Sequence, residues 1–75
     1  MLKDGPYRFF FYSADGGEPP HIHVVRDIAT AKFWLEPVSL VKNDGFRGVE
    51  IRDIERVVKE QATVFLVKWH EYFEN

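Results

Sequence analysis

Two histidines, His21 and His23, are separated by a single residue in a stretch rich in β-branched side chains. Side chains two residues apart on a strand point to the same face, so the two imidazoles should lie together. Imidazole titrates at about pH 6.5 and can both accept and donate a proton, as phosphodiester cleavage requires. His21 and His23 are therefore the candidate catalytic residues of a ribonuclease, with Arg8 and Lys32 stabilising charge on the phosphate.

The same pair also offers two nitrogen ligands to a metal ion. Zinc needs at least three protein ligands, and the further donors are Asp15, Glu18 and the distant His70. The spacing alone is too common to assign a metal, so we predict no metal or cofactor and keep His21 and His23 as the candidate ligands. A third interpretation makes both histidines ordinary strand residues, hydrogen-bonded to the Pro-Pro loop and packed against aromatic neighbours.

Pairs of glycines and prolines divide the first part of the chain, to about Asn43, into short segments. These segments are rich in aromatic and β-branched residues, which favour strands. Two of them are separated only by a short turn near Asp27 and should form an antiparallel hairpin. The predicted strands are 6–13, 21–26 and 30–35, and residues 38–42 form either a fourth, edge strand or an extended connector.

From Gly48 onward the apolar residues take up helical spacing. They recur alternately three and four residues apart from Ile51 to Phe73, which predicts one amphipathic helix. A straight helix of this span would be about 40 Å long, whereas six-residue strands span about 20 Å. We therefore expect the helix either to kink near Thr63 or to overhang the sheet and pack on a second copy of the chain.

Together these elements predict a single α+β domain over residues 1–75, with a sheet region at 1–43 and a helical region at 44–75. We expect a three- to four-stranded antiparallel sheet with one long C-terminal helix, straight or kinked, packed on one face. The composition agrees, because 45% hydrophobic and 29% charged residues are typical of a globular domain.

Alternation along the strands divides their side chains between two faces. One face is apolar throughout and should lie under the helix; it contains Tyr7, Phe9, Phe11, Ile22, Val24, Ala31, Phe33 and Leu35. The opposite face contains Arg8, Phe10, Tyr12, His21, His23, Lys32 and Trp34. Flat rings among cations can stack bases and contact phosphates, and they also occur where a partner protein binds. A one-residue slip of the second strand would turn both histidines inward.

The overall charge and residue content exclude several classes of protein. A net charge of −2 gives no general attraction to nucleic acid or anionic lipid. The absence of cysteine excludes disulfides and cysteine nucleophiles. We find no apolar stretch long enough for a signal peptide or a membrane span, so we expect a cytoplasmic protein that does not bind membranes.

Several separated motifs, in order, resemble the short prokaryotic proteins grouped as domain of unknown function 4160. They are PPHIHV within residues 18–24, AKFWL at 31–35, Gly45-Phe46, the segment 50–54 and WHEYF at 69–73. The resemblance covers almost the whole chain from Phe9 onward. One departure is at the helix start, where Arg47 replaces the serine of a capping box while Glu50 remains, at a cost of about 1 kcal/mol.

The resemblance implies a genetic context but no reaction. Members are usually encoded beside a second small protein, often of the domain of unknown function 2442 group, in arrangements like toxin–antitoxin pairs. We therefore expect one component of such a module, which binds that partner or itself through the helix end and through the sheet face whose candidate binding residues are Arg8, Phe10, Tyr12, Lys32 and Trp34. A histidine-dependent ribonuclease is the enzymatic version, and a non-catalytic nucleic-acid-binding or regulatory module is the alternative. The sequence leaves open whether the protein is an enzyme, and whether it is a toxin or an antitoxin.

Overall fold

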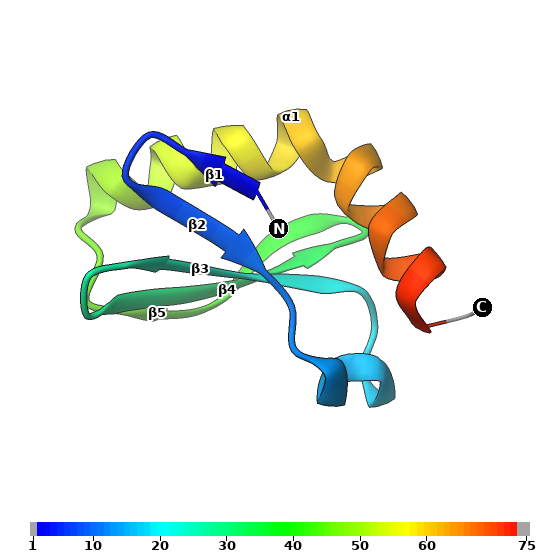
Figure 1. The fold of residues 1–75 in the computed structure, drawn as a ribbon. Coiled ribbons are helices and arrows are strands. Elements are labelled where there is room, and N and C mark those ends of the chain that lie inside the picture. Colours follow the sequence, from blue (N-terminus) through cyan, green and yellow to red (C-terminus); the bar gives the residue numbers. More distant parts are fainter. Residues whose placement is uncertain (1, 74–75) are drawn as a thin grey trace.

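The computed structural model describes residues 2–73 and consists of one antiparallel sheet, a short 3-10 helix and a long α-helix (Figure 1). The strands are β1 (Leu2–Asp4), β2 (Tyr7–Phe10), β3 (His21–Arg26), β4 (Ala29–Leu35) and β5 (Val38–Asp44). The 3-10 helix η1 (Ser13–Gly17) lies between β2 and β3, and α1 (Gly48–Phe73) follows β5. The α+β class and the single long C-terminal helix are confirmed.

The sheet has five strands in the order β1-β2-β3-β4-β5, not the three to four that we predicted. The prediction missed β1 because it is only three residues long. It pairs with β2 through the two-residue turn Gly5-Pro6, in which Gly5 has the positive φ of 57° that this turn needs. The segment 38–42, which the sequence left open, is part of β5, which pairs six of its seven residues with β4 and has an irregularity between Lys32 and Phe33.

The strand register places the two sets of side chains on opposite faces, as the alternation predicts. Ile22 lies opposite Phe33, and Val24 lies between Phe9 and Ala31. These residues face α1 and form one apolar core. The fully buried members are Phe9, Ile22, Val24 and Phe33 from the sheet and Ile54, Val58 and Phe65 from the helix.

The start of α1 is fixed by polar contacts at its first turn. The Arg47 backbone N–H donates a hydrogen bond of 3.0 Å to Glu50 Oε1, which is the half of the capping box that the sequence retains. Glu50 also forms an ion pair with Arg26 at the end of β3. Just before the helix, the Asn43 side chain bonds both the N–H and the carbonyl of Phe46, at 3.0 Å each. These contacts join the helix start to the sheet.

The second half of α1 bends toward the end of the sheet (Figure 1). Its 26 residues would span about 39 Å if straight, slightly more than the 36 Å longest dimension of the molecule. The bend lets a helix longer than the sheet stay in contact with it, and the helix end packs on its own chain. Trp69 and Phe73 contact Phe11, with ring centroids 5.4 and 5.5 Å away, and Phe73 covers Gly16 of η1. No helix within residues 2–73 combines the length and apolar character needed to cross a membrane.

Candidate functional site

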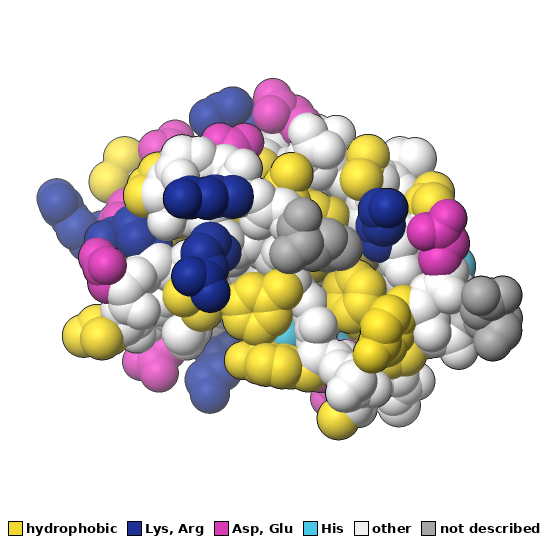
Figure 2. Space-filling model, in the orientation of Figure 1, with side chains coloured by type: hydrophobic (Ala, Val, Ile, Leu, Met, Phe, Trp, Pro, Cys, Tyr) yellow, Lys and Arg dark blue, Asp and Glu magenta, His cyan; other side chains and the backbone are white. Residues whose placement is uncertain are grey.

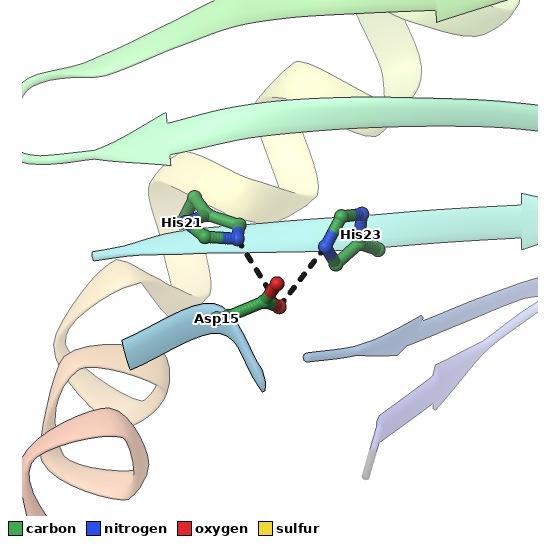
Figure 3. A group of neighbouring side chains, drawn as sticks. All are labelled: Asp15, His21 and His23. Atoms are coloured by element: carbon green, nitrogen blue, oxygen red, sulfur yellow. Dashed lines mark hydrogen bonds and ion pairs between the residues drawn. The ribbon is translucent and has the colours of Figure 1, made fainter. Parts of the chain in front are cut away.

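Asp15, His21 and His23 converge where η1 approaches the first half of β3 (Figure 3). Asp15 Oδ2 lies 3.1 Å from His21 Nε2 and 3.1 Å from His23 Nε2. The two histidines share a face of β3, since Ile22 between them points into the core. The sequence named Asp15 only as one of three further donors, and the structure selects it.

Asp15 is held by the backbone of its own turn. The Tyr12 N–H donates a hydrogen bond of 2.8 Å to Asp15 Oδ2, which closes the start of η1. Partial burial raises the pKa of the Asp15 carboxyl, but this hydrogen bond and the two nearby imidazoles outweigh burial and lower it overall. Asp15 is therefore a carboxylate at neutral pH, aimed between the histidines.

His21 is fully buried, although it lies on the face of the sheet that we expected to be open. Its ring lies 5.0 Å from Trp69 at the bent end of α1 and 5.8 Å from Trp34 of β4. His21 Nδ1 is 2.9 Å from the carbonyl oxygen of Pro19, which can only accept a hydrogen bond, so Nδ1 carries the proton. Nε2 has no hydrogen-bond partner within residues 2–73.

His23 remains accessible to solvent, with 21% of its side chain exposed. Its ring stacks on Phe10 at 5.8 Å and contacts Tyr12 at 4.8 Å. Burial lowers the pKa of His23 below its ordinary value, against the opposing influence of the Asp15 carboxylate. The imidazole is therefore neutral at pH 7 and able to accept a proton or a metal ion.

A shallow depression of about 330 Å³ begins beside His23. Of the five binding residues predicted from sequence, Phe10, Tyr12 and Lys32 line it, whereas Arg8 lines a separate depression of about 300 Å³ near β1. The Lys32 ammonium lies over the ring of Trp34, with Nζ 5.1 Å from the ring centroid. Phe10 lines both depressions, so Arg8 shares the face of the sheet with the other predicted residues but not the depression beside His23.

Lys32 does not offer a free cation to this depression. Its Nζ lies 2.6 Å from Glu18 Oε1, and this hydrogen bond lowers the pKa of the Glu18 carboxyl. Glu18 Oε1 also lies 3.7 Å from His21 Nδ1, but the convergent ligand group found within residues 2–73 contains neither Glu18 nor the exposed His70. Sequence reasoning missed Lys42, which lies opposite Lys32 and lines the depression. The position of Lys42 depends on the irregular pairing of β4 with β5, and the sequence carries no signal of that irregularity.

Comparison with known proteins gives one match. Residues 7–70 match a family described as "Domain of unknown function (DUF4160)", which agrees with the resemblance carried by the motifs. No curated protein and no solved structure matches the chain significantly.

Proposed function

The chain belongs to the DUF4160 family, and from that membership we propose that it is one cytoplasmic component of a toxin–antitoxin-like two-protein module. In this proposal it acts by binding a second small protein, of the domain of unknown function 2442 type, through the face of the sheet that carries Phe10, Tyr12 and Trp34. We call these three residues the aromatic face. The observation that carries the proposal is that α1 packs most of its length on the other side of the sheet and reaches this side only at His21, through Trp69, so that the three rings keep part of their surface exposed.

The exposure of the rings supports a protein partner. Tyr12 is 56% exposed, and Phe10 and Trp34 are half-buried. Aromatic side chains that keep part of their surface in water are typical of the centre of protein interfaces. In the view of Figure 2, hydrophobic side chains gather across the middle of the molecule, with Lys and Arg side chains around them and most of these on the left.

The charges near the aromatic face favour a protein over a nucleic acid. The Lys32 ammonium is paired with Glu18, and the Asp15 carboxylate lies beside His23. The net charge of the chain is −2. A phosphate backbone approaching this face would meet the two carboxylates beside the paired Lys32, with Lys42 and Arg8 as the other cations of the face.

The test is binding between this protein and the small protein encoded beside it, measured by titration calorimetry. Tyr12→Lys places a charge on the aromatic face and should weaken binding at least tenfold, about 1.4 kcal/mol. Val49→Lys is the matched control, because Val49 is 50% exposed at the start of α1, away from that face. Failure of the wild type to bind, or equal effects of the two variants, would overturn the proposal.

A second candidate is RNA cleavage, favoured by the Asp15–His23 contact at the edge of the depression. In this version neutral His23 takes the proton of a ribose hydroxyl, Asp15 orients its ring, and Lys42 stabilises charge on the phosphate. Buried His21 positions Asp15 and does not touch substrate. The measurement is RNA cleavage by wild type and by His23→Gln, with equal melting temperatures. Cleavage that survives the substitution excludes this mechanism, and RNA binding without cleavage would favour the non-catalytic nucleic-acid module.

A further inference from the structure

We propose that Asp15, His21 and His23 bind a divalent transition-metal ion of the Zn²⁺ class. The starting observation is the buried Nε2 of His21, which lacks a hydrogen-bond partner within residues 2–73 and lies 3.1 Å from Asp15 Oδ2. This inference stands independently of the partner-binding proposal, because it needs neither the aromatic face nor a second protein.

The tautomer of His21 determines what Nε2 can accept. The proton on Nδ1 is directed to the Pro19 carbonyl, so Nε2 of the neutral ring carries a lone pair. Asp15 Oδ2, which also has lone pairs, lies 3.1 Å from Nε2 without forming a hydrogen bond, and two acceptors this close repel each other unless a cation is bound to both.

A proton relieves only part of this arrangement. One proton can lie in only one of the two N···O contacts of Asp15 Oδ2, and that oxygen already accepts the Tyr12 N–H. A divalent ion instead accepts the lone pairs of His21, His23 and Asp15 together. The three ligand atoms lie within 4.8 Å of one another. Ligands at 2.0–2.1 Å in a tetrahedron are about 3.3 Å apart, so the two 3.1 Å separations are close to those of a zinc centre.

The surroundings of the ligands have the features of a built metal site. Metal-binding histidines usually donate their other N–H to a carbonyl or carboxylate, as His21 does to Pro19. Trp69 and Trp34 fix the ring of His21, and Phe10 fixes the ring of His23. The ligands are thus held in place before the ion arrives, and less conformational entropy is lost on binding.

The ligand types narrow the choice of ion. Two imidazole nitrogens and one carboxylate oxygen suit Zn²⁺, Co²⁺ or Fe²⁺ and are too few in oxygen for Ca²⁺ or Mg²⁺. Three protein ligands leave at least one position for water or a ligand, as in catalytic rather than structural zinc sites. The exposed edge of His23 and the depression beside it provide the access such a position requires.

The test uses the full chain, freed of metal by a chelator and titrated with Zn²⁺ and separately with Co²⁺. We expect one ion per chain and a rise in melting temperature of about 10 °C or more when free Zn²⁺ is about a hundred times its Kd. With Co²⁺ we expect the visible absorption of a four- or five-coordinate nitrogen and oxygen site. An unchanged melt and no absorption in wild type would overturn the proposal.

Variants assign the binding to these residues. Asp15→Asn keeps an oxygen for the Tyr12 N–H but removes the charge, and His23→Gln removes one nitrogen ligand; each should weaken Zn²⁺ binding more than tenfold. His70→Gln, on the exposed side of α1, is the matched control and should bind as wild type does. Buried His21 is left intact, so that loss of folding is not mistaken for loss of a ligand. Binding that survives both ligand variants, or is lost in the control, would contradict the assignment.

Discussion

The two ends of α1 each rest on a polar cluster, and the clusters differ in what they leave unpaired. At the start of the helix, Arg26 pairs with Glu50, whose carboxylate also caps the Arg47 N–H. Under the bent end of the helix, His21 and His23 surround Asp15. Both clusters join the helix to β3, yet only the second has the composition of a site.

The distinction lies in the kind of atom that remains without a partner. At the first cluster it is Arg26 Nε, an N–H on a permanently charged group that packs over Phe46 and cannot bind a metal. At the second it is His21 Nε2, a lone pair on a buried ring. An unpaired buried donor on a cation adds only a cost, whereas an unpaired buried acceptor beside a carboxylate is a potential ligand. This difference distinguishes the first cluster, which only joins the helix to the sheet, from the second, which we propose as a binding site.

The largest expected effect comes from removing the cover over His21. Trp69 is 3% exposed, so Trp69→Ala should destabilise the fold by about 3–5 kcal/mol, a large part of the roughly 4–11 kcal/mol expected for 75 residues. It should also weaken Zn²⁺ binding, because the ring of His21 loses its contact with Trp69 and is held less firmly. Phe46→Ala at the other end should be destabilising too but leave Zn²⁺ affinity unchanged. Denaturant unfolding measures the two stabilities, and calorimetry at temperatures where both variants are folded measures the two Zn²⁺ affinities. Equal Zn²⁺ affinities in the two variants would contradict the difference between the clusters.

A smaller effect follows from the close packing of η1 against the helix end. A Cβ built on Gly16 lies 2.7 Å from Phe73 Cδ1, whereas one built on Gly17 meets nothing within 4 Å. Gly16→Ala should therefore displace the Phe73 ring at a cost of about 1 kcal/mol, and Gly17→Ala should not. Near-ultraviolet circular dichroism and melting temperature distinguish the two variants. A Gly16→Ala protein that melts like Gly17→Ala would mean that Phe73 moves freely.

At the other end of α1, restoring the missing cap should stabilise the protein. Arg47→Ser supplies a hydroxyl to the first turn and should add about 0.5–1 kcal/mol, or a few degrees in melting temperature. The gain should be smaller when Glu50 is first changed to Ala, because the serine can still cap the first turn but the reciprocal contact of the box is lost. No gain in the wild-type background would show that the first turn is already fully satisfied.

The smallest effect is a change in acid sensitivity at the helix start. The Arg47 N–H lowers the pKa of the Glu50 carboxyl below its ordinary 4.5, and Arg26 adds to this. A carboxyl with a lowered folded-state pKa stabilises the fold above about pH 4.5 and loses that contribution as pH falls through the lowered value. Glu50→Gln should therefore flatten the acid limb of the stability curve. Overlapping limbs for the two proteins, measured by denaturant unfolding between pH 3 and 7 (~0.5-unit steps), would contradict this.

The sequence predicted most of the sheet geometry because side-chain alternation is a local rule. It placed Phe9 and Phe33 under the helix and put Phe10 and Lys32 on the other face, as the register has them. The prediction missed the short β1, because three residues are too few to show alternation and only the Gly5-Pro6 turn indicates the hairpin.

The site was predictable only in part, for a physical reason. The histidine spacing predicts that two rings share a face, but the path of a glycine-rich loop decides which acid reaches them. The sequence did not choose between Asp15 and Glu18, the two carboxylates close to the histidines, and only the turn closed by the Tyr12 N–H distinguishes Asp15. The burial of His21 depends on the bend of α1, which brings Trp69 over it from a distant part of the chain.

The order of the strands also bears on how the chain folds. Because every strand pairs with its sequence neighbour, each pairing step closes only a short loop of chain. Such a topology has a low contact order for a sheet protein and should fold quickly for its class. The ligands at Asp15, His21 and His23 lie within one short connection and the strand that follows it. An ion present during folding could therefore link η1 to β3 before the helix docks, and so act as a nucleus rather than a late addition.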